Sequence, residues 1–135
     1  MVSDRPVPAR GSAALAPPRV LVVSGDQWPR ALLRAALCDA GFDAIGATTL
    51  SGALRHAPAD VERGPVRLLV VDGRAALAEP AALEQARLRY PDALLALIQR
   101  AGTAPAGPWA AILRRPLTIG EIVVSVRRLV PLPAS

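Results

Sequence analysis

The stretch that decides the fold is residues 67–74, which read RLLVVDGR. Four apolar residues, 68–71, are followed by the turn signal Asp72-Gly73, and a short apolar run with such an ending predicts a buried strand. Strands of this type occur in parallel sheets that helices cover on both faces, where ligands bind beyond the carboxyl ends of the strands. Asp72 stands at such an end and is therefore the first candidate for a functional residue.

The length and composition indicate a single globular domain. The chain has 135 residues, of which 52% are hydrophobic, enough for one buried core. No apolar run approaches the roughly 20 residues of a membrane-spanning helix, and prolines interrupt the basic N-terminus where a signal peptide would need an apolar segment. Cys38 is the only cysteine, so no internal disulfide can form, and we expect a cytoplasmic location.

The charge balance is basic, with a formal net charge of +5, and every basic side chain is an arginine. The arginines are scattered along the chain, and aromatic residues make up only 3% of it. We therefore do not expect nucleic-acid binding, although a basic nucleic-acid-binding module stays as an alternative of another class.

The patterns along the chain divide it into three parts. Residues 1–18, rich in proline and alanine, are predicted to be a disordered leader, residues 19–131 one folded domain and residues 132–135 a tail. Besides the strand that ends at Asp72, strands are predicted over residues 20–23, 43–47, 93–98 and 109–113. Helices are predicted over residues 29–40, 49–56, 80–90 and 118–130.

Two local signals refine this outline. The segment 99–109 contains several helix breakers, which leave room for at most one helical turn. These are Gly102, Pro105, Gly107 and Pro108. Thr118 and Glu121 have the spacing of a capping box, in which two side chains satisfy free backbone groups at the start of a helix. The sequence therefore predicts an irregular crossing before the fifth strand and a well-defined last helix.

Strands that alternate with helices favour an α/β fold with a doubly wound parallel sheet. Two strand orders are common in such sheets, a dinucleotide-binding order and a flavodoxin-like order. The turn after the first strand reads SGDQWP and lacks the GxGxxG pattern, which argues against dinucleotide binding. No nucleophile–base pair, phosphate loop or metal-ligand cluster indicates an enzyme, so a nucleotide-binding α/β enzyme stays only as an alternative.

Four segments together resemble the receiver domains of response regulators. They read RVLVVSGDQWPRALLRAALCDAGF, RLLVVDGR, PDALLALIQR and ILRRPLTIGEIVVSVRRLV, and the resemblance covers about residues 19–130. It implies a flavodoxin-like sheet with strand order 2-1-3-4-5 and, given the breakers, a reduced fourth helix. It also implies an acidic pair after the first strand, a phospho-accepting Asp after the third, a Thr or Ser after the fourth and a Lys-Pro after the fifth.

The resemblance places Asp72 at the phosphoacceptor position, where the family residue is kept. The acidic pair falls on Ser24 and Gly25, which carry no carboxylate, and Asp26 lies one residue beyond. Mg²⁺ is held by carboxylates and waters and neutralises charge during phosphoryl transfer. We therefore expect no firmly bound cofactor and only weak Mg²⁺ binding.

The resemblance places Gln99 and Arg115 at the two remaining family positions. Gln99 lacks the hydroxyl of the family's Thr or Ser, and Arg115 keeps the positive charge of the Lys in a planar shape. Since Asp72 needs a counter-charge or donors, we expect Arg115 to contact it, directly or through one water, with Gln99 nearby.

These substitutions predict a degenerate domain of the pseudo-receiver type. We expect a single-domain atypical response regulator in two-component or phosphorelay-type signalling that is not an enzyme and works independently of phosphorylation. Because no output domain follows in this sequence, we expect it to act by protein–protein interaction with a kinase, output or regulatory protein. A homodimer stays open, and we expect no membrane partner. The alternative within this class is a receiver still phosphorylated at Asp72, with Asp26 assisting Mg²⁺.

Overall fold

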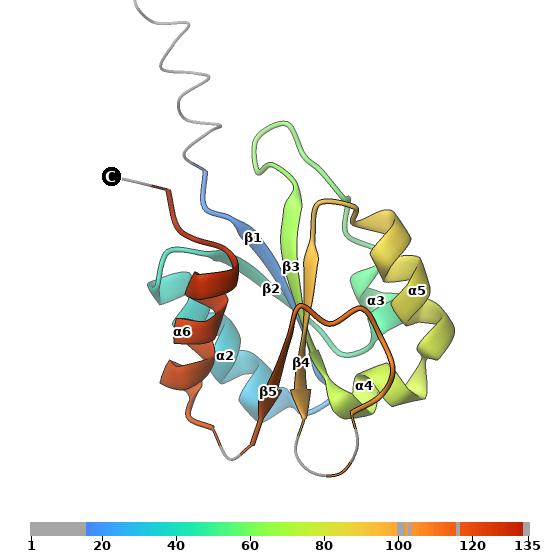
Figure 1. Cartoon of the computed structure of the whole chain (residues 1–135). Helices are drawn as coiled ribbons and strands as arrows, with labels where there is room; N and C mark the ends of the chain where they lie inside the picture. The colour runs from blue at the N-terminus through green and yellow to red at the C-terminus, as the bar shows by residue number, and fades with distance from the viewer. Residues whose placement is uncertain (1–15, 100–101, 103, 116, 134–135) are drawn as a thin grey trace, which may run out of the picture.

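Five parallel strands form one sheet in the order β2-β1-β3-β4-β5 (Figure 1). The structure, a computed structural model of the chain, describes residues 16–99, 102, 104–115 and 117–133. The strands are β1 (Arg19–Val23), β2 (Asp43–Ala47), β3 (Val66–Asp72), β4 (Leu94–Gln99) and β5 (Ala111–Arg114). The predicted strand order 2-1-3-4-5 is confirmed, and the dinucleotide-binding order is excluded. The fifth strand was predicted over residues 109–113 and begins two residues later, at Ala111.

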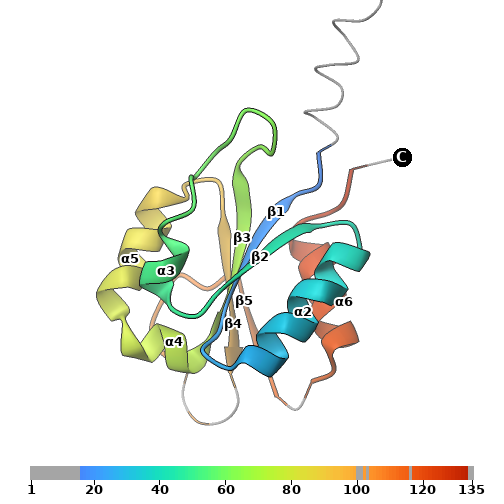
Figure 2. The same cartoon turned by 180° about the vertical axis from the view of Figure 1, so that it is seen from behind.

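Five helices in the described residues cover the two faces of the sheet. α2 (Gln27–Asp39) and α6 (Ile119–Leu129) lie on one face, whereas α3 (Leu50–Ala53), α4 (Gly73–Ala78) and α5 (Pro80–Arg89) lie on the other (Figure 1, Figure 2). Right-handed crossovers between parallel strands produce this doubly wound arrangement. None of these helices has the length and apolar character that a membrane-spanning helix requires.

Burial on both faces explains why β1 and β3 are so apolar. Every residue of β1 is buried, as are residues 68–71 of β3. Successive side chains of a strand point to opposite faces, so the two strands supply two separate clusters. Leu21 and Leu69 pack with α3 and α5, whereas Val20 and Val70 pack with α2 and α6. Each fully buried side chain of this size stabilises the fold by about 1.5–3 kcal/mol relative to an exposed one.

The last helix begins with the predicted capping box. The Thr118 hydroxyl accepts a hydrogen bond from the Glu121 backbone N–H at 3.0 Å, and Glu121 Oε1 accepts one from the Thr118 N–H at 2.8 Å. These bonds satisfy backbone donors that have no partner within the helix. They therefore fix the point at which the chain leaves β5 and enters α6.

Two regions differ from the predicted pattern of helices. Asp72-Gly73 is a turn signal in the sequence and no helix was predicted directly after it, yet α4 begins at Gly73. Asp72 has extended backbone angles and caps α4, because its Oδ1 accepts a hydrogen bond from the Arg74 N–H at 2.8 Å. The helix predicted over residues 49–56 is shorter and covers only Leu50–Ala53, where Thr49 supplies the cap.

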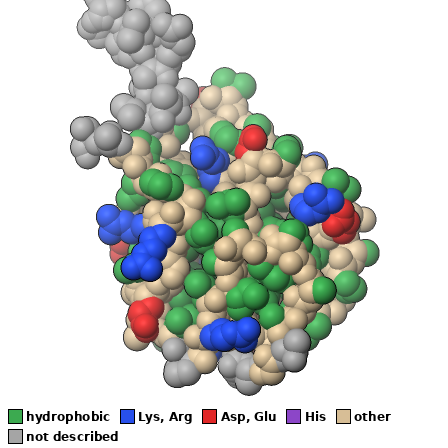
Figure 3. Space-filling model, in the orientation of Figure 1, with side chains coloured by type: hydrophobic (Ala, Val, Ile, Leu, Met, Phe, Trp, Pro, Cys, Tyr) green, Lys and Arg blue, Asp and Glu red, His purple; other side chains and the backbone are tan. Residues whose placement is uncertain are grey.

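The crossing from β4 to β5 contains no helix among its described residues, 102 and 104–110, which agrees with the effect expected of its breakers. Trp109 anchors this crossing, because its Nε1 donates a hydrogen bond to the Pro105 carbonyl at 2.8 Å and its ring packs against the cluster beneath α5. Space is tight here, since a Cβ added to Gly107 would lie 2.9 Å from the Trp109 ring. The edge strand stays partly open, with Ile112 39% exposed. Figure 3 shows hydrophobic side chains gathered across the middle of this face.

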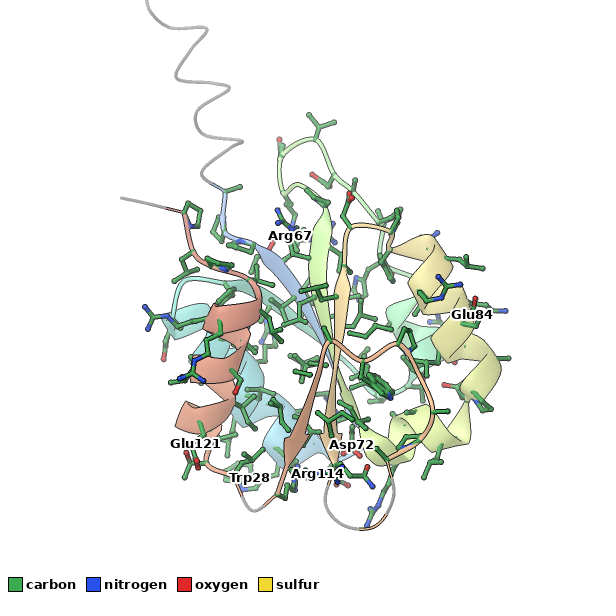
Figure 4. All side chains as sticks on the ribbon, viewed as in Figure 1. Trp28, Arg67, Asp72, Glu84, Arg114 and Glu121 are labelled. Atoms are coloured by element: carbon green, nitrogen blue, oxygen red, sulfur yellow. The ribbon has the colours of Figure 1, made fainter. Side chains whose placement is uncertain are left out.

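The described ends of the chain meet at one edge of the sheet. Residues 16–18, 130, 131 and 133 line one cavity of about 240 Å³, together with the start of β3. This edge holds the amino ends of the strands, opposite to the edge at which Asp72 lies (Figure 4). Most of the predicted disordered leader, residues 1–15, and the end of the tail, residues 134–135, lie outside the described residues.

The two tryptophans provide a test of this packing. Replacing Trp109 by alanine should lower the free energy of unfolding by about 2 kcal/mol, less than a fully buried tryptophan would cost, because the ring is only partly buried. Replacing Trp28, which is 74% exposed, should change it by less than about 0.5 kcal/mol. Urea unfolding followed by circular dichroism measures both. Equal losses for the two variants would contradict the packing of the crossing.

Candidate functional site

The carboxyl ends of the strands bring the predicted site residues to one edge of the sheet. Asp72 ends β3 and Gln99 ends β4, while Ser24 follows β1 and Arg115 follows β5. Figure 4 shows Asp72 at this edge, close to Arg114 in the view and far from Arg67 at the opposite edge. In a parallel sheet the carboxyl ends of all strands meet at one edge, so this convergence follows from the topology.

The Asp72 carboxylate is held by two uncharged donors. Its Oδ2 accepts a hydrogen bond from the Ser24 hydroxyl at 3.1 Å, and its Oδ1 accepts the Arg74 N–H that makes it the cap of α4. Ser24 is itself fixed, because it is only 7% exposed and its hydroxyl accepts the Asp26 N–H at 3.3 Å. Arg30 donates to the Ser24 carbonyl at 2.8 Å. Both carboxylate oxygens of Asp72 therefore already serve the local structure.

Arg115 and Asp72 line the same cavity, and the sequence analysis expected a contact between them. Both residues line one cavity of about 250 Å³, and Gln99 lines it too, so the three are neighbours as expected. Among the described contacts no ion pair or hydrogen bond joins Arg115 directly to Asp72, and the expected contact, direct or through one water, stays a prediction. The Asp72 carboxylate accepts hydrogen bonds from the Ser24 hydroxyl and the Arg74 N–H.

The Gln99 side chain lies next to Gly73, which has no side chain to occupy that space. The residue is 7% exposed, and its carbonyl accepts the Arg115 N–H at 2.8 Å. A Cβ added to Gly73 would lie 2.5 Å from Gln99 Oε1, closer than real atoms of this kind approach. Gly73 therefore leaves the room in which the end of the Gln99 side chain lies, a role that the sequence analysis missed because a strand-ending Asp-Gly also reads as a turn.

Asp26 lies on the other side of Asp72. The two carboxylates line one cavity of about 340 Å³ with Gly25, Arg74 and Glu79. Asp26 precedes α2 without capping it through its side chain.

The donor set does not fit a strong Mg²⁺ site. Within the described part of the chain, no three His, Cys, Asp or Glu side chains stand close enough to hold a metal ion. The two residues that follow β1 supply the Ser24 hydroxyl and the bare backbone of Gly25, whereas Mg²⁺ prefers carboxylate oxygens in octahedral geometry.

Glu79 lines the cavity of about 340 Å³ that Asp26 and Asp72 share, and it forms hydrogen bonds to a neighbouring helix. Its carboxylate accepts hydrogen bonds from the Ser51 hydroxyl at 2.8 Å and from the Ser51 N–H at 3.2 Å. The hydroxyl bond, and then the backbone bond, lower the pKa of Glu79 below its ordinary value of 4.5. The junction of α4 and α5 is thereby fastened to the start of α3 while Glu79 is ionised.

Comparison with solved structures identifies the fold. The chain is similar to the chemotaxis protein CheY4 of Vibrio cholerae, with a TM-score of 0.69 and 18% identity over 85% of this chain and 100% of that chain. The non-phosphorylated receiver domain of HemR from Leptospira biflexa gives 0.66 and 21% over 87% and 98%. A response regulator from Thermotoga maritima gives 0.64 and 18% over 84% and 98%. No model of a protein family and no curated protein sequence matches the chain.

The topology defines an α/β protein of the flavodoxin-like class. More narrowly, the chain has the fold of response-regulator receiver domains, as its sequence resemblance implied. At these identities the likeness establishes the fold, whereas the role depends on the residues that the site contains.

A double-mutant cycle tests the packing of Gln99 over Gly73. Gly73→Ala should lower the free energy of unfolding by about 1 kcal/mol, the low end of the range for overpacking, because the new Cβ displaces only the end of the flexible Gln99 side chain. In a Gln99→Ala background most of this loss should disappear, since the next atom that the Cβ would meet, the Ile98 carbonyl oxygen, lies at an ordinary 3.5 Å. Urea unfolding measures all four proteins. An equal loss in both backgrounds would refute the contact.

The Glu79–Ser51 contact should depend on pH. Because the pKa of Glu79 in the folded protein lies below its unfolded value, the contact contributes fully above about pH 4.5 and is lost as the pH falls through the folded pKa. The Ser51 amide signal in an NMR titration should report a midpoint below 4.5, and Glu79→Gln should abolish it. A midpoint at or above the ordinary value would contradict the hydrogen bonds.

Proposed function

We propose that the chain is an atypical receiver of the pseudo-receiver type that works without phosphorylation. The observation that supports this most is the state of Asp72, whose two carboxylate oxygens accept hydrogen bonds from Ser24 and from the first turn of α4. A carboxylate used as a helix cap stabilises the structure by about 1 kcal/mol. Converting it to an acyl phosphate would replace one of these acceptors by a bulky phosphoryl group.

The residues around Asp72 are also poorly suited to hold the Mg²⁺ that phosphorylation requires. Acyl-phosphate formation requires a carboxylate oxygen to attack phosphorus while the donor leaves, and Mg²⁺ neutralises the charge on the phosphoryl oxygens. Ser24 and Gly25 provide no carboxylate for that ion, and Gln99 provides no hydroxyl for the phosphoryl group. A non-enzymatic role in two-component or phosphorelay-type signalling fits these residues better than catalysis does.

In this proposal the domain acts by binding a protein, such as a kinase, an output protein or a regulatory protein in the cytoplasm. The surface offers apolar side chains for such contacts, including Trp28 at the start of α2 and Ile112 on the edge strand. A second copy of the chain is one such partner. Nucleic acid is not proposed, because the arginines are distributed over the fold and two of them, Arg63 and Arg87, pair with Asp43 and Glu84.

Acetyl phosphate provides the test. After incubation of the full chain with acetyl phosphate and Mg²⁺, intact mass should show little or no added phosphoryl group. Gly25→Asp is the matched variant: it restores one carboxylate, and the nearest atom to the new Cβ is the Thr48 carbonyl oxygen at 3.9 Å, so it has room. This variant should be labelled more than the wild type. Wild-type labelling as complete as that of the variant, and lost in Asp72→Asn, would overturn the proposal.

One observation favours the second candidate, a receiver that is still phosphorylated at Asp72. Asp26 lines the same cavity of about 340 Å³ as Asp72, so two carboxylates face one space. If Asp26 assists Mg²⁺, substantial labelling of the wild type should fall in Asp26→Asn and be kept in Asp43→Asn, a matched change at the opposite edge of the sheet.

A further inference from the structure

The cavity between α4 and the ends of β4 and β5 has features of a ligand site. Its volume is about 250 Å³, slightly below the range of about 300–1,000 Å³ that is typical for pockets of drug-sized molecules. It is built by three elements: Asp72 and Arg74 lie where β3 passes into α4, Ile98 lies near the end of β4, and Arg115 follows β5.

The cavity carries an excess of positive charge. Arg74 and Arg115 line it with a single carboxylate, that of Asp72. Ser24 and the Arg74 backbone already donate to that carboxylate. Among the residues that the structure describes, neither guanidinium forms an ion pair. Figure 3 shows a basic patch at the lower edge of the face, where Figure 4 labels Arg114 beside Asp72.

Two apolar side chains also line this cavity. Ile98 on β4 is 8% exposed, whereas Leu77, three residues after Arg74 on α4, is 65% exposed. A large apolar side chain at the rim of a polar cavity leaves surface that an apolar group could cover. The cavity lining therefore combines two cationic side chains with two apolar ones.

We propose that this cavity binds a small organic anion, with a phosphate or carboxylate head group between Arg74 and Arg115 and a compact apolar body against Leu77 and Ile98. The planar guanidinium fork matches both kinds of head group through paired hydrogen bonds. The inference rests on the proposed function in one respect, because the cavity is available only while Asp72 carries no phosphoryl group.

Such a ligand would couple two parts of the fold. Arg74 belongs to α4, and Arg115 begins the segment that leads into α6 on the other face of the sheet. An anion held by both guanidiniums bridges these elements across the edge of the sheet. Binding would thus act as the signal that sets the shape of this edge for a protein partner.

Phenyl phosphate and benzoate are suitable probes, with benzyl alcohol as the neutral match and inorganic phosphate as the head group alone. Amide shifts of the full chain in NMR titrations should saturate with the two organic anions at dissociation constants on the order of 1 mM. The shifts should centre on Gly73 and Arg115. Benzyl alcohol and inorganic phosphate should each bind at least about tenfold more weakly.

Arginine variants locate the site. Arg74→Gln and Arg115→Gln should each raise the dissociation constant of phenyl phosphate about tenfold. Arg67→Gln removes the same charge from an exposed position at the opposite edge of the sheet and should leave it unchanged. Arg115→Lys keeps the charge and controls for loss of folding, and it should bind with intermediate strength.

Two results would overturn the inference: no saturable shifts with either organic anion, or equal weakening by Arg67→Gln and Arg115→Gln, which would show a general charge effect. Acetyl-phosphate labelling separates the two proposals. An unlabelled protein that binds no anion refutes this inference alone, whereas efficient labelling of Asp72 refutes the proposed function.

Discussion

Burial of β1 and β3 on both faces is the constraint on which the rest of the structure depends. Each strand has neighbours on both sides and helices above and below, so residues 20–23 of β1 and residues 68–71 of β3 are all apolar and buried. Polar residues therefore collect where the strands end. Ser24 and Asp72 follow from this directly, since each stands at the first position where β1 or β3 leaves the core. The hydrogen bond between them joins the two central strands at this edge.

The role of Asp72 illustrates a conflict between structural and chemical use of one side chain. A helix cap requires a carboxylate or hydroxyl oxygen that stays aimed at the backbone, whereas a nucleophile requires an oxygen that is free to react. In this chain the cap is strengthened by the Ser24 hydroxyl, which takes the second oxygen. Ser24 thus supplies a hydroxyl donor that holds Asp72 in place, where a carboxylate could not donate to it.

Much of the fold could be predicted from the sequence, because its determinants are local or periodic. The apolar runs at β1 and β3, the capping box of α6 and the breakers between residues 102 and 108 each act within a few positions. The residues at the carboxyl edge were also predicted, since the ends of parallel strands must meet. α4 was missed because Asp72-Gly73 serves equally as a turn or as a helix start, and only the alanine-rich residues that follow favour the helix.

The details of the site could not be predicted for a different reason. Asp72 could contact Arg115 or Ser24, which follow different strands. Which contact forms depends on differences in distance of about the length of one side chain, and no sequence pattern encodes such differences. The fit of Gln99 over Gly73 is of the same kind, since it joins residues 26 positions apart through close packing. Sequence spacing indicates which residues can be neighbours, and packing decides which of them touch.

The position of the two chain ends has a practical consequence for handling the protein. Residues 16–18 and 130–133 lie together at the amino edge of the sheet, and the cavities around Asp72 lie at the opposite edge. A group introduced at residue 16 or residue 133 would therefore lie at the amino edge and leave the Asp72 edge open to solution. Immobilised through such a group on a sensor surface, the domain would present the Asp72 edge to every analyte.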